Sequence, residues 1–239
     1  MQSCHPIAGL EWILRLPKLL EATKALKSML GSSGLGPSAT QIVYRFSYSK
    51  IMSLPSGISL LIDFAFKLAF GRENHVGPLI SLLNAILNPV VRIVELELLN
   101  PFGLQEFQDD KSSVLDIKAR DANGAYFNIE MQIATIIAIE KRMTYYGCSV
   151  YRGQLQKGDN YSDLRAVYAI CLLDDYIWQT DSAKHHRFQL MDRQTGRVLE
   201  ETLEIHFLEL PKYNLAESEL SHATSIERWV YLIRNAQNY

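Results

Sequence analysis

The 239-residue sequence has only three cysteines, at positions 4, 148 and 171, and no two of them have CxxC spacing. This argues against a disulfide framework and a cysteine-based zinc site, and favours a reducing compartment. No run of about 18 uninterrupted apolar residues occurs, so no transmembrane span is predicted. The apolar N-terminal stretch is broken by charged residues and by Pro17 and follows no basic region, which argues against a secretory signal. We expect a cytoplasmic protein without membrane partners.

An excess of charge of one sign is also absent. The chain has 24 Lys and Arg residues against 26 Asp and Glu, a formal net charge of −2. This balance excludes a generally basic nucleic-acid binder that works by bulk phosphate neutralisation, but it permits a local basic groove or an acidic metal site. The glycine-rich phosphate-binding motifs GxxxxGK[ST] and GxGxxG are missing, as is the GxSxG elbow of many serine hydrolases.

The composition shifts near residue 57. Residues 1–57 contain six basic and two acidic residues, a balance of +4, and the other 182 residues carry −6. Within the first part, residues 31–38 form a Gly/Ser-rich stretch typical of a flexible linker. We interpret residues 1–57 as an N-terminal extension that is poorly ordered or loosely packed, and residues 58–239 as the folded domain. An overextended gene start and a functional arm both explain the extension.

The rest of the chain alternates between helical and strand-like patterns. Apolar spacing predicts helices over Leu60–Phe70, Val76–Leu87, Ile137–Lys157 and Glu217–Ala236. Strand patterns cover Val91–Leu98, Ser113–Asp121, Ala125–Ile133, Arg165–Leu173, Arg187–Met191 and Thr202–Leu208. Because helices flank a run of strands on both sides, the predicted class is α/β (α+β) with a central mixed sheet.

The second and third of these strands carry the chemistry. Between them lies Ala122-Asn123-Gly124, and a three-residue hairpin loop with Gly124 in the left-handed conformation is a common connection. Such a loop would pair Asp121 with Ala125 and therefore place Asp116 directly beside Glu130. The β carbons of the two carboxylates would then lie roughly 5 Å apart on one face of the sheet.

Two carboxylates that close repel each other unless positive charge separates them. A hard divalent cation such as Mg²⁺ takes oxygen ligands and can serve this purpose. The alternative is an ordinary solvated face on which Lys118 and Arg120 supply the counter-charges. The pattern of the two strands is compatible with both.

A wider set of motifs resembles one known family. Asp63-Phe-Ala-Phe-Lys67, Leu115-Asp-Ile117, Asn128-Ile-Glu-Met-Gln132 and Arg142-Met-Thr-Tyr-Tyr146 occur in the order and at the spacing of the PD-(D/E)XK nuclease family transposases, also called Rpn-type recombination-promoting nucleases. The resemblance covers about residues 60–237. It implies a restriction-endonuclease-like core, in which helices flank a central mixed β-sheet. It also implies hydrolysis of DNA phosphodiesters with Mg²⁺, for which Mn²⁺ can substitute.

The resemblance also assigns roles to individual residues. Asp116 corresponds to the central metal-binding aspartate and Glu130 to the second acidic ligand, while the backbone carbonyl of Met131 would add a third ligand. Asp63 is the family's additional acidic residue near the metal. Gln132 stands where the wider superfamily has lysine, and its neutral amide can act only through hydrogen bonds.

Two basic residues are weaker candidates. Lys67 would contact DNA or cover a helix face. Arg142 would contact a phosphate or stack on the neighbouring tyrosines, because residues three and four positions apart are adjacent on a helix. His185 and His186 are unsuited to binding zinc together, since adjacent strand residues point to opposite faces.

The sequence therefore predicts an Mg²⁺-dependent endonuclease of the recombination-promoting type that acts on double-stranded DNA, as a monomer or a homodimer. The alternative is a catalytically inactive DNA-binding or interaction module left by a mobile element. The geometry of Asp63, Asp116 and Glu130 separates the two, because an enzyme requires that these carboxylates converge.

Overall fold

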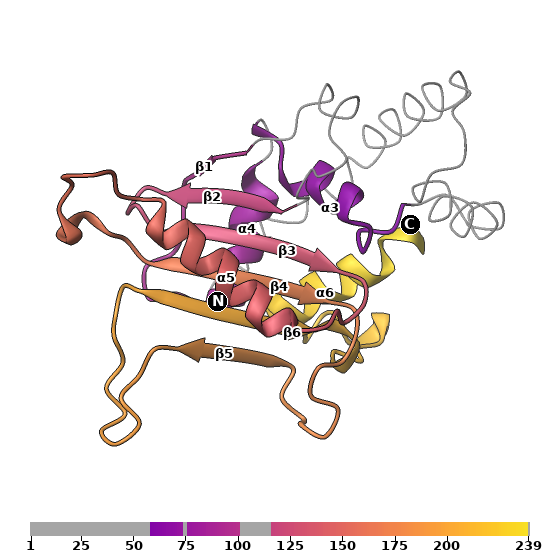
Figure 1. The fold of residues 1–239 in the computed structure, drawn as a ribbon. Coiled ribbons are helices and arrows are strands. Elements are labelled where there is room, and N and C mark those ends of the chain that lie inside the picture. The colour runs from indigo at the N-terminus through magenta and orange to yellow at the C-terminus, as the bar shows by residue number, and fades with distance from the viewer. Residues whose placement is uncertain (1–57, 74–75, 101–115, 239) are drawn as a thin grey trace, which may run out of the picture. The chain divides into compact units, whose positions relative to one another are not determined.

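The fold is built on one mixed sheet, seen in the computed structural model that describes residues 58–73, 76–100 and 116–238 (Figure 1). Within these ranges, six strands lie in the order β1-β2-β3-β4-β6-β5. They are β1 (Leu96–Leu98), β2 (Ile117–Asp121), β3 (Tyr126–Gln132), β4 (Val167–Leu173), β5 (His185–Gln189) and β6 (Leu203–Glu209). The strands β3, β4 and β6 run parallel, whereas the other pairs are antiparallel. The predicted class, an α/β mixed sheet flanked by helices with a restriction-endonuclease-like architecture, is confirmed.

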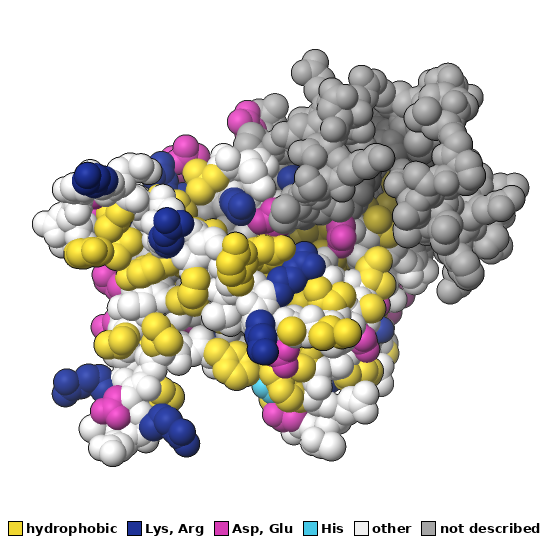
Figure 2. Space-filling view, in the orientation of Figure 1, with side chains coloured by type: hydrophobic (Ala, Val, Ile, Leu, Met, Phe, Trp, Pro, Cys, Tyr) yellow, Lys and Arg dark blue, Asp and Glu magenta, His cyan; other side chains and the backbone are white. Residues whose placement is uncertain are grey.

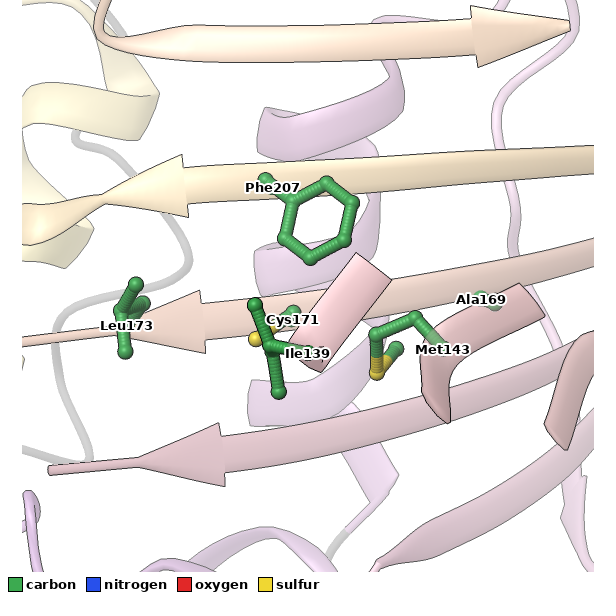
Figure 3. Packing of buried hydrophobic residues seen from close by; sticks show 6 residues of the cluster. All are labelled: Ile139, Met143, Ala169, Cys171, Leu173 and Phe207. Carbon is green, nitrogen blue, oxygen red and sulfur yellow. The ribbon is translucent and has the colours of Figure 1, made fainter. Parts of the chain in front are cut away.

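The helix α5 (Ile139–Arg152) connects β3 to β4 and crosses one face of the sheet, in front of it in Figure 1. Its residues Ile139 and Met143 pack on Ala169, Cys171 and Leu173 of β4 and on Phe207 of β6 (Figure 3). These apolar side chains are all buried, with exposed fractions of 2% or less. The burial of this cluster fixes α5 above the central strands.

The helix α4 (Val76–Leu87) lies behind the sheet (Figure 1) and buries Leu79, Leu82, Leu83 and Ile86. The helix α6 (Ser225–Asn235) packs against it, and the Trp229 indole donates a hydrogen bond to the Ser81 hydroxyl at 3.2 Å. The short helix α3 (Asp63–Phe70) contacts α4 and β3, and its last ring, Phe70, lies 5.7 Å from the ring of Trp229. None of the described helices is both long and apolar enough to cross a membrane.

Several predicted boundaries were wrong. The strand predicted over Val91–Leu98 is reduced to β1. The segment before it exposes Val91 and Val94 and pairs with no strand among the described residues, although its sequence alternates. The helix that follows β3 ends at Arg152 before Gly153 instead of reaching Lys157. The last helix begins at Ser225, because Thr224 and Glu227 form a capping box that the sequence already contained.

Some predictions fall outside the described residues. They concern the extension 1–57 and residues 113–115 of the second predicted strand.

Candidate metal centre

The β2–β3 hairpin has the predicted register. Ile117 stands opposite Ile129, so Asp116, immediately before β2, stands beside Glu130. The turn is closed by the Asp121 N–H, which donates to the Ala125 carbonyl at 3.0 Å, and Gly124 adopts a φ of +87°. A residue other than glycine at that φ would be strained, so the turn chemistry sets the register that pairs the two carboxylates.

Both carboxylates are buried. The exposed fractions of Asp116 and Glu130 are 3% and 4%. Burial raises the pKa of Asp116, against the opposing charges of Lys118 and Lys67. Burial likewise raises the pKa of Glu130; the charge of Arg142 opposes this rise, and the negative charges of Asp116 and Asp63 add to it. Since the charges of Asp116 and Asp63 both disfavour ionisation of Glu130, bound positive charge would stabilise the ionised form of the group.

The helix α3 brings a third carboxylate and an ammonium group. Asp63 is the first residue of α3, and Lys67 follows one turn later on the same side of the helix. Burial raises the pKa of Asp63, and the Arg142 charge opposes it. The helix α3 packs against β3; the charge of Asp63 adds to the rise in the pKa of Glu130, and the charge of Lys67 opposes the rise in the pKa of Asp116.

Glu130 is held by two side chains. Arg142, on α5, forms an ion pair with Glu130 Oε1 at 2.6 Å through Nη2, and its guanidinium lies 5.2 Å from the centre of the Tyr146 ring. The Gln132 amide, on the same strand face, donates to the same oxygen at 2.5 Å. Oxygen Oε1 is thus occupied by two donors, whereas Oε2 has no hydrogen-bond partner among the described residues.

Several polar atoms of this region are buried without a hydrogen-bond partner among the described residues. They include Asp63 Oδ1, Glu130 Oε2, Arg142 Nε and both polar side-chain atoms of Asn128. Asn128 is fully buried, two residues before Glu130 on the same face of β3. Buried polar atoms are nearly always paired in folded proteins, so this concentration marks a region built for something other than stability.

The donor set fits a hard divalent cation. Carboxylate oxygens are the ligands such an ion prefers, and Mg²⁺ is commonly held by one or two carboxylates with water and substrate phosphate completing its shell. Two of the unpartnered atoms, Asp63 Oδ1 and Glu130 Oε2, are of this kind. Within the described ranges, no three His, Cys, Asp or Glu side chains are grouped closely enough to enclose a metal by themselves. The geometry fits a site with two carboxylate ligands better than a full protein cage.

The structure places Asp116 beside Glu130 and Gln132 on one face of the hairpin, and Asp63 on α3, which packs against β3; among the described residues, the three carboxylates do not form a group close enough to hold a metal ion by themselves. Met131 lies between Glu130 and Gln132 on β3, with its side chain buried on the opposite face, so only its backbone can belong to the site. Arg142 and Lys67 face this group as well. The sequence had left open a DNA contact or a helix face for Lys67. For Arg142 it had left open a phosphate contact or stacking on the neighbouring tyrosines, and the guanidinium does lie over the Tyr146 ring.

Some features of the site were not predicted from the sequence. The ion pair of Arg142 with Glu130 depends on how α5 packs over β3, which spacing alone does not give. The alternation of β3 had placed Asn128 on the same face as Glu130, but its complete burial comes from the cover of α5 and from β4. For Lys67, the useful signal was its position four residues after Asp63.

The comparison with protein families finds a match. A model described as PD-(D/E)XK nuclease family transposase matches residues 60–239, about three quarters of the chain and every residue of the site. No curated protein and no solved structure matches the chain.

Proposed function

Because the chain belongs to the PD-(D/E)XK nuclease family transposases, we propose that it is a metal-dependent endonuclease that hydrolyses phosphodiester bonds of double-stranded DNA, of the recombination-promoting (Rpn) type. The single observation that carries the proposal is the pair of buried carboxylates, Asp116 and Glu130, side by side on the hairpin. Burying two repelling carboxylates is costly, and a bound cation offsets this cost.

Mg²⁺ is the proposed cofactor, with Mn²⁺ as a substitute. Asp116 and Glu130 would hold it, together with the backbone carbonyl of Met131, and Asp63 would reach it from α3. When bound, such an ion lowers the pKa of a coordinated water and stabilises the charge that develops on a phosphate.

The remaining residues would position the reactants. Gln132 is neutral, so it would align the attacking water through hydrogen bonds and would not add charge. Arg142 already lies against Glu130, and its guanidinium has a buried Nε without a described partner. A phosphate oxygen beside the carboxylates would give this group an acceptor, which supports a role for Arg142 in holding the DNA backbone.

The local cations on the surface support binding of a nucleic acid, although the protein as a whole carries little net charge. Figure 2 shows the face covered by α5, where Lys and Arg side chains are scattered among hydrophobic ones. With a net charge of −2, DNA affinity would come from these local cations and from the metal. The proposal includes double-stranded DNA as substrate, a cytoplasmic location and a homodimer as the working assembly.

One observation favours the alternative, an inactive DNA-binding or interaction module. Arg142 neutralises Glu130 directly, so the site is partly compensated without any metal. In that case the carboxylates would be remnants of an active site, and DNA would bind without being cleaved.

A plasmid-nicking assay separates the two functions. The protein is incubated with supercoiled plasmid in Mg²⁺, in Mn²⁺ and in EDTA, and nicked and linear products are quantified. The enzyme proposal expects products with either metal and none in EDTA. DNA binding in a gel-shift assay without cleavage under any metal condition would instead establish the inactive module.

A further inference from the structure

The loop that connects β3 to α5, residues 133–138, presents isoleucine side chains to solvent (Figure 1). Ile137 is fully exposed and Ile133 is 55% exposed. Ile136, in contrast, packs against the apolar cluster beneath α5. Single exposed apolar residues are common on protein surfaces, so the meaning of Ile137 depends on how its backbone is held and on where the loop lies.

Ile137 is followed by a strained residue. Ala138 has a φ of +61° and a ψ of +38°, a left-handed conformation that residues other than glycine, asparagine and aspartate seldom adopt. Such strain persists only where the surrounding structure imposes it, and it is concentrated at functional sites. The next residue, Ile139, is buried in the core under α5. The turn therefore directs Ile137 outward between two isoleucines that are anchored inside.

Hydrogen bonds also hold the loop before Ile137. The Thr135 N–H donates to the Asp175 carboxylate at 2.8 Å, and the Thr135 hydroxyl donates to the Tyr176 carbonyl at 3.2 Å. The Asp175 carboxylate accepts a further bond from the Tyr176 N–H at 2.8 Å. The loops that follow β3 and β4 are thus tied together, and Ile137 projects from a segment that is fixed on both sides.

The loop lies between two residues of the candidate metal centre. Gln132, whose amide donates to Glu130 at 2.5 Å, directly precedes Ile133. Arg142 pairs with Glu130 at 2.6 Å, and its N–H donates to the carbonyl of the residue after Ile137. One peptide step and one helical turn separate Ile137 from Arg142, so their α carbons lie within about 10 Å of each other. Because the major groove of DNA alone is about 12 Å wide, a duplex with a phosphate at Glu130 also reaches Ile137.

On the basis of the proposed nuclease function, we propose that Ile137 is an apolar wedge that inserts between two stacked base pairs of the bound DNA, next to the phosphodiester that is cleaved. Isoleucine is one of the side chains that proteins insert in this way, and the insertion partly unstacks the base step and kinks the duplex. Pyrimidine–purine steps such as TA and CA/TG are kinked or unstacked most easily. Ile137 would therefore direct cleavage to flexible steps without a hydrogen bond to any base.

The first test measures unstacking without cleavage. A short duplex carries 2-aminopurine, whose fluorescence rises when it loses its stacking neighbours, at one TA step between stiff A-tracts. The measurement is made in Ca²⁺, under conditions in which gel electrophoresis shows bound and intact duplex. The wild type should raise the fluorescence. At saturating protein, Ile137→Ala should lose most of this rise, and Ile137→Met should retain it, because methionine is also an apolar wedge.

The matched control is Val91→Ala. Val91 is 73% exposed and lies outside the described helices and strands, so this variant should raise the fluorescence as the wild type does.

The second test maps the nicks that each protein makes in a plasmid with Mg²⁺, by sequencing the DNA ends. The wild type should favour pyrimidine–purine steps. In Ile137→Ala this preference should fall on the order of tenfold, because three carbons of the wedge are lost. The rise in melting temperature on adding Mg²⁺ should remain, since the carboxylates are intact.

Two outcomes would overturn the assignment. The first is that Ile137→Ala and the wild type give the same fluorescence and the same cleavage positions. The second is that Ile137→Ala dissociates a wild-type dimer in sedimentation velocity, because Ile137 would then contact a second copy of the chain. A wild type that raises the fluorescence but nicks no plasmid in any metal would support the wedge and overturn the nuclease function, so the two failures are distinguishable.

Discussion

Two groups of buried carboxylates lie on the same sheet, and they differ in their hydrogen-bond partners and in the direction of their pKa shifts. At the β2–β3 hairpin, burial raises the pKa values of Asp116 and Glu130, and several polar atoms nearby have no partner among the described residues. At the β5–β6 edge, burial would raise the pKa of Glu204, but bonds from His206, Arg187 and Gln189 outweigh it and lower this pKa to about 2.

Glu209 is a second example of the well-partnered kind. It is fully buried, and its carboxylate accepts hydrogen bonds from the backbone N–H groups of Ile177 and Trp178, at 2.6 and 3.1 Å, and from Lys212 at 2.5 Å. The fold can therefore provide hydrogen-bond donors to a buried carboxylate that has a structural role. At the hairpin, Glu130 Oε1 also has partners, but Glu130 Oε2 and Asp63 Oδ1 are buried without a hydrogen-bond donor among the residues that the structure describes, which supports the assignment of a functional centre.

The sharpest test of this contrast is Asp116→Ala. Cleavage should fall by at least about 10³-fold, because a metal ligand is lost. The folded state should be as stable as the wild type or more so, because the substitution removes a repulsive charge beside Glu130. Nicking rates and thermal melts of both proteins check this. Wild-type cleavage by the variant would contradict the role of Asp116.

The matching change in the other group is Glu209→Ala. It leaves two buried backbone N–H groups without their acceptor and removes the carboxylate paired with Lys212, whose ammonium keeps its bonds to the Trp178 and Ala183 carbonyls, so the free energy of unfolding should fall by about 3–5 kcal/mol. Urea unfolding monitored by circular dichroism measures the loss. Cleavage by the folded fraction should stay near the wild-type rate. A variant as stable as the wild type would remove the distinction between the two groups.

A smaller effect is expected at Gln132. Gln132→Ala should reduce cleavage on the order of 10²-fold, as for the loss of one positioned hydrogen-bonding group. Gln132→Lys should retain measurable metal-dependent cleavage, because lysine also reaches the attacking water or the phosphate. Equal rates for Gln132→Ala and the wild type would exclude Gln132 from the reaction.

The weakest effect, and the one with a characteristic sign, is the dependence of stability on pH. The raised pKa values of Asp116 and Glu130 mean that the metal-free fold holds more protons than the unfolded chain above their ordinary values of 3.8 and 4.5. The stability they contribute is therefore present at low pH and is lost as pH rises through the raised values.

Glu204 acts in the opposite direction. Because its pKa is lowered to about 2, its contribution is present above about pH 4.5 and is lost as pH falls towards 2. The curve of melting temperature against pH, measured between about pH 3 and pH 7, should become flatter at the acidic end in Glu204→Gln and at the upper end in Asp116→Asn. If both variants showed the same dependence of melting temperature on pH, the proposed difference between the two groups of carboxylates would be contradicted.

The hairpin site was predictable because its geometry is local. The turn at 122–124, the left-handed Gly124 and the alternation of both strands fixed the register before any tertiary contact was known. Asp63 was reached only through the family resemblance, since its approach depends on how α3 packs. The same locality explains the failure at residues 91–94, where an alternating pattern found no neighbouring strand among the described residues.

The second group of carboxylates was not predictable in the same way. Lys212 and His206 are close in sequence to Glu209 and Glu204, but the other partners come from β5 and from the loop after β4, and these contacts form only when distant segments pair. The opposite orientation of His185 and His186, in contrast, followed from strand geometry. His185 bonds to His206 at 2.8 Å, and His186 lies 3.2 Å from Glu209 on the other face.

The turn between β2 and β3 also determines which sequence changes the protein can tolerate. Asp116 and Glu130 are joined by one contiguous hairpin, so insertions or deletions elsewhere in the domain leave their register unchanged. Inserting one residue between Asp121 and Ala125 that shifts the pairing of β2 by one position would remove Asp116 from its place opposite Glu130 and turn its side chain to the other face of the sheet. We therefore expect functional length variants to spare residues 122–124, while surface loops such as 192–196 accept changes of any length.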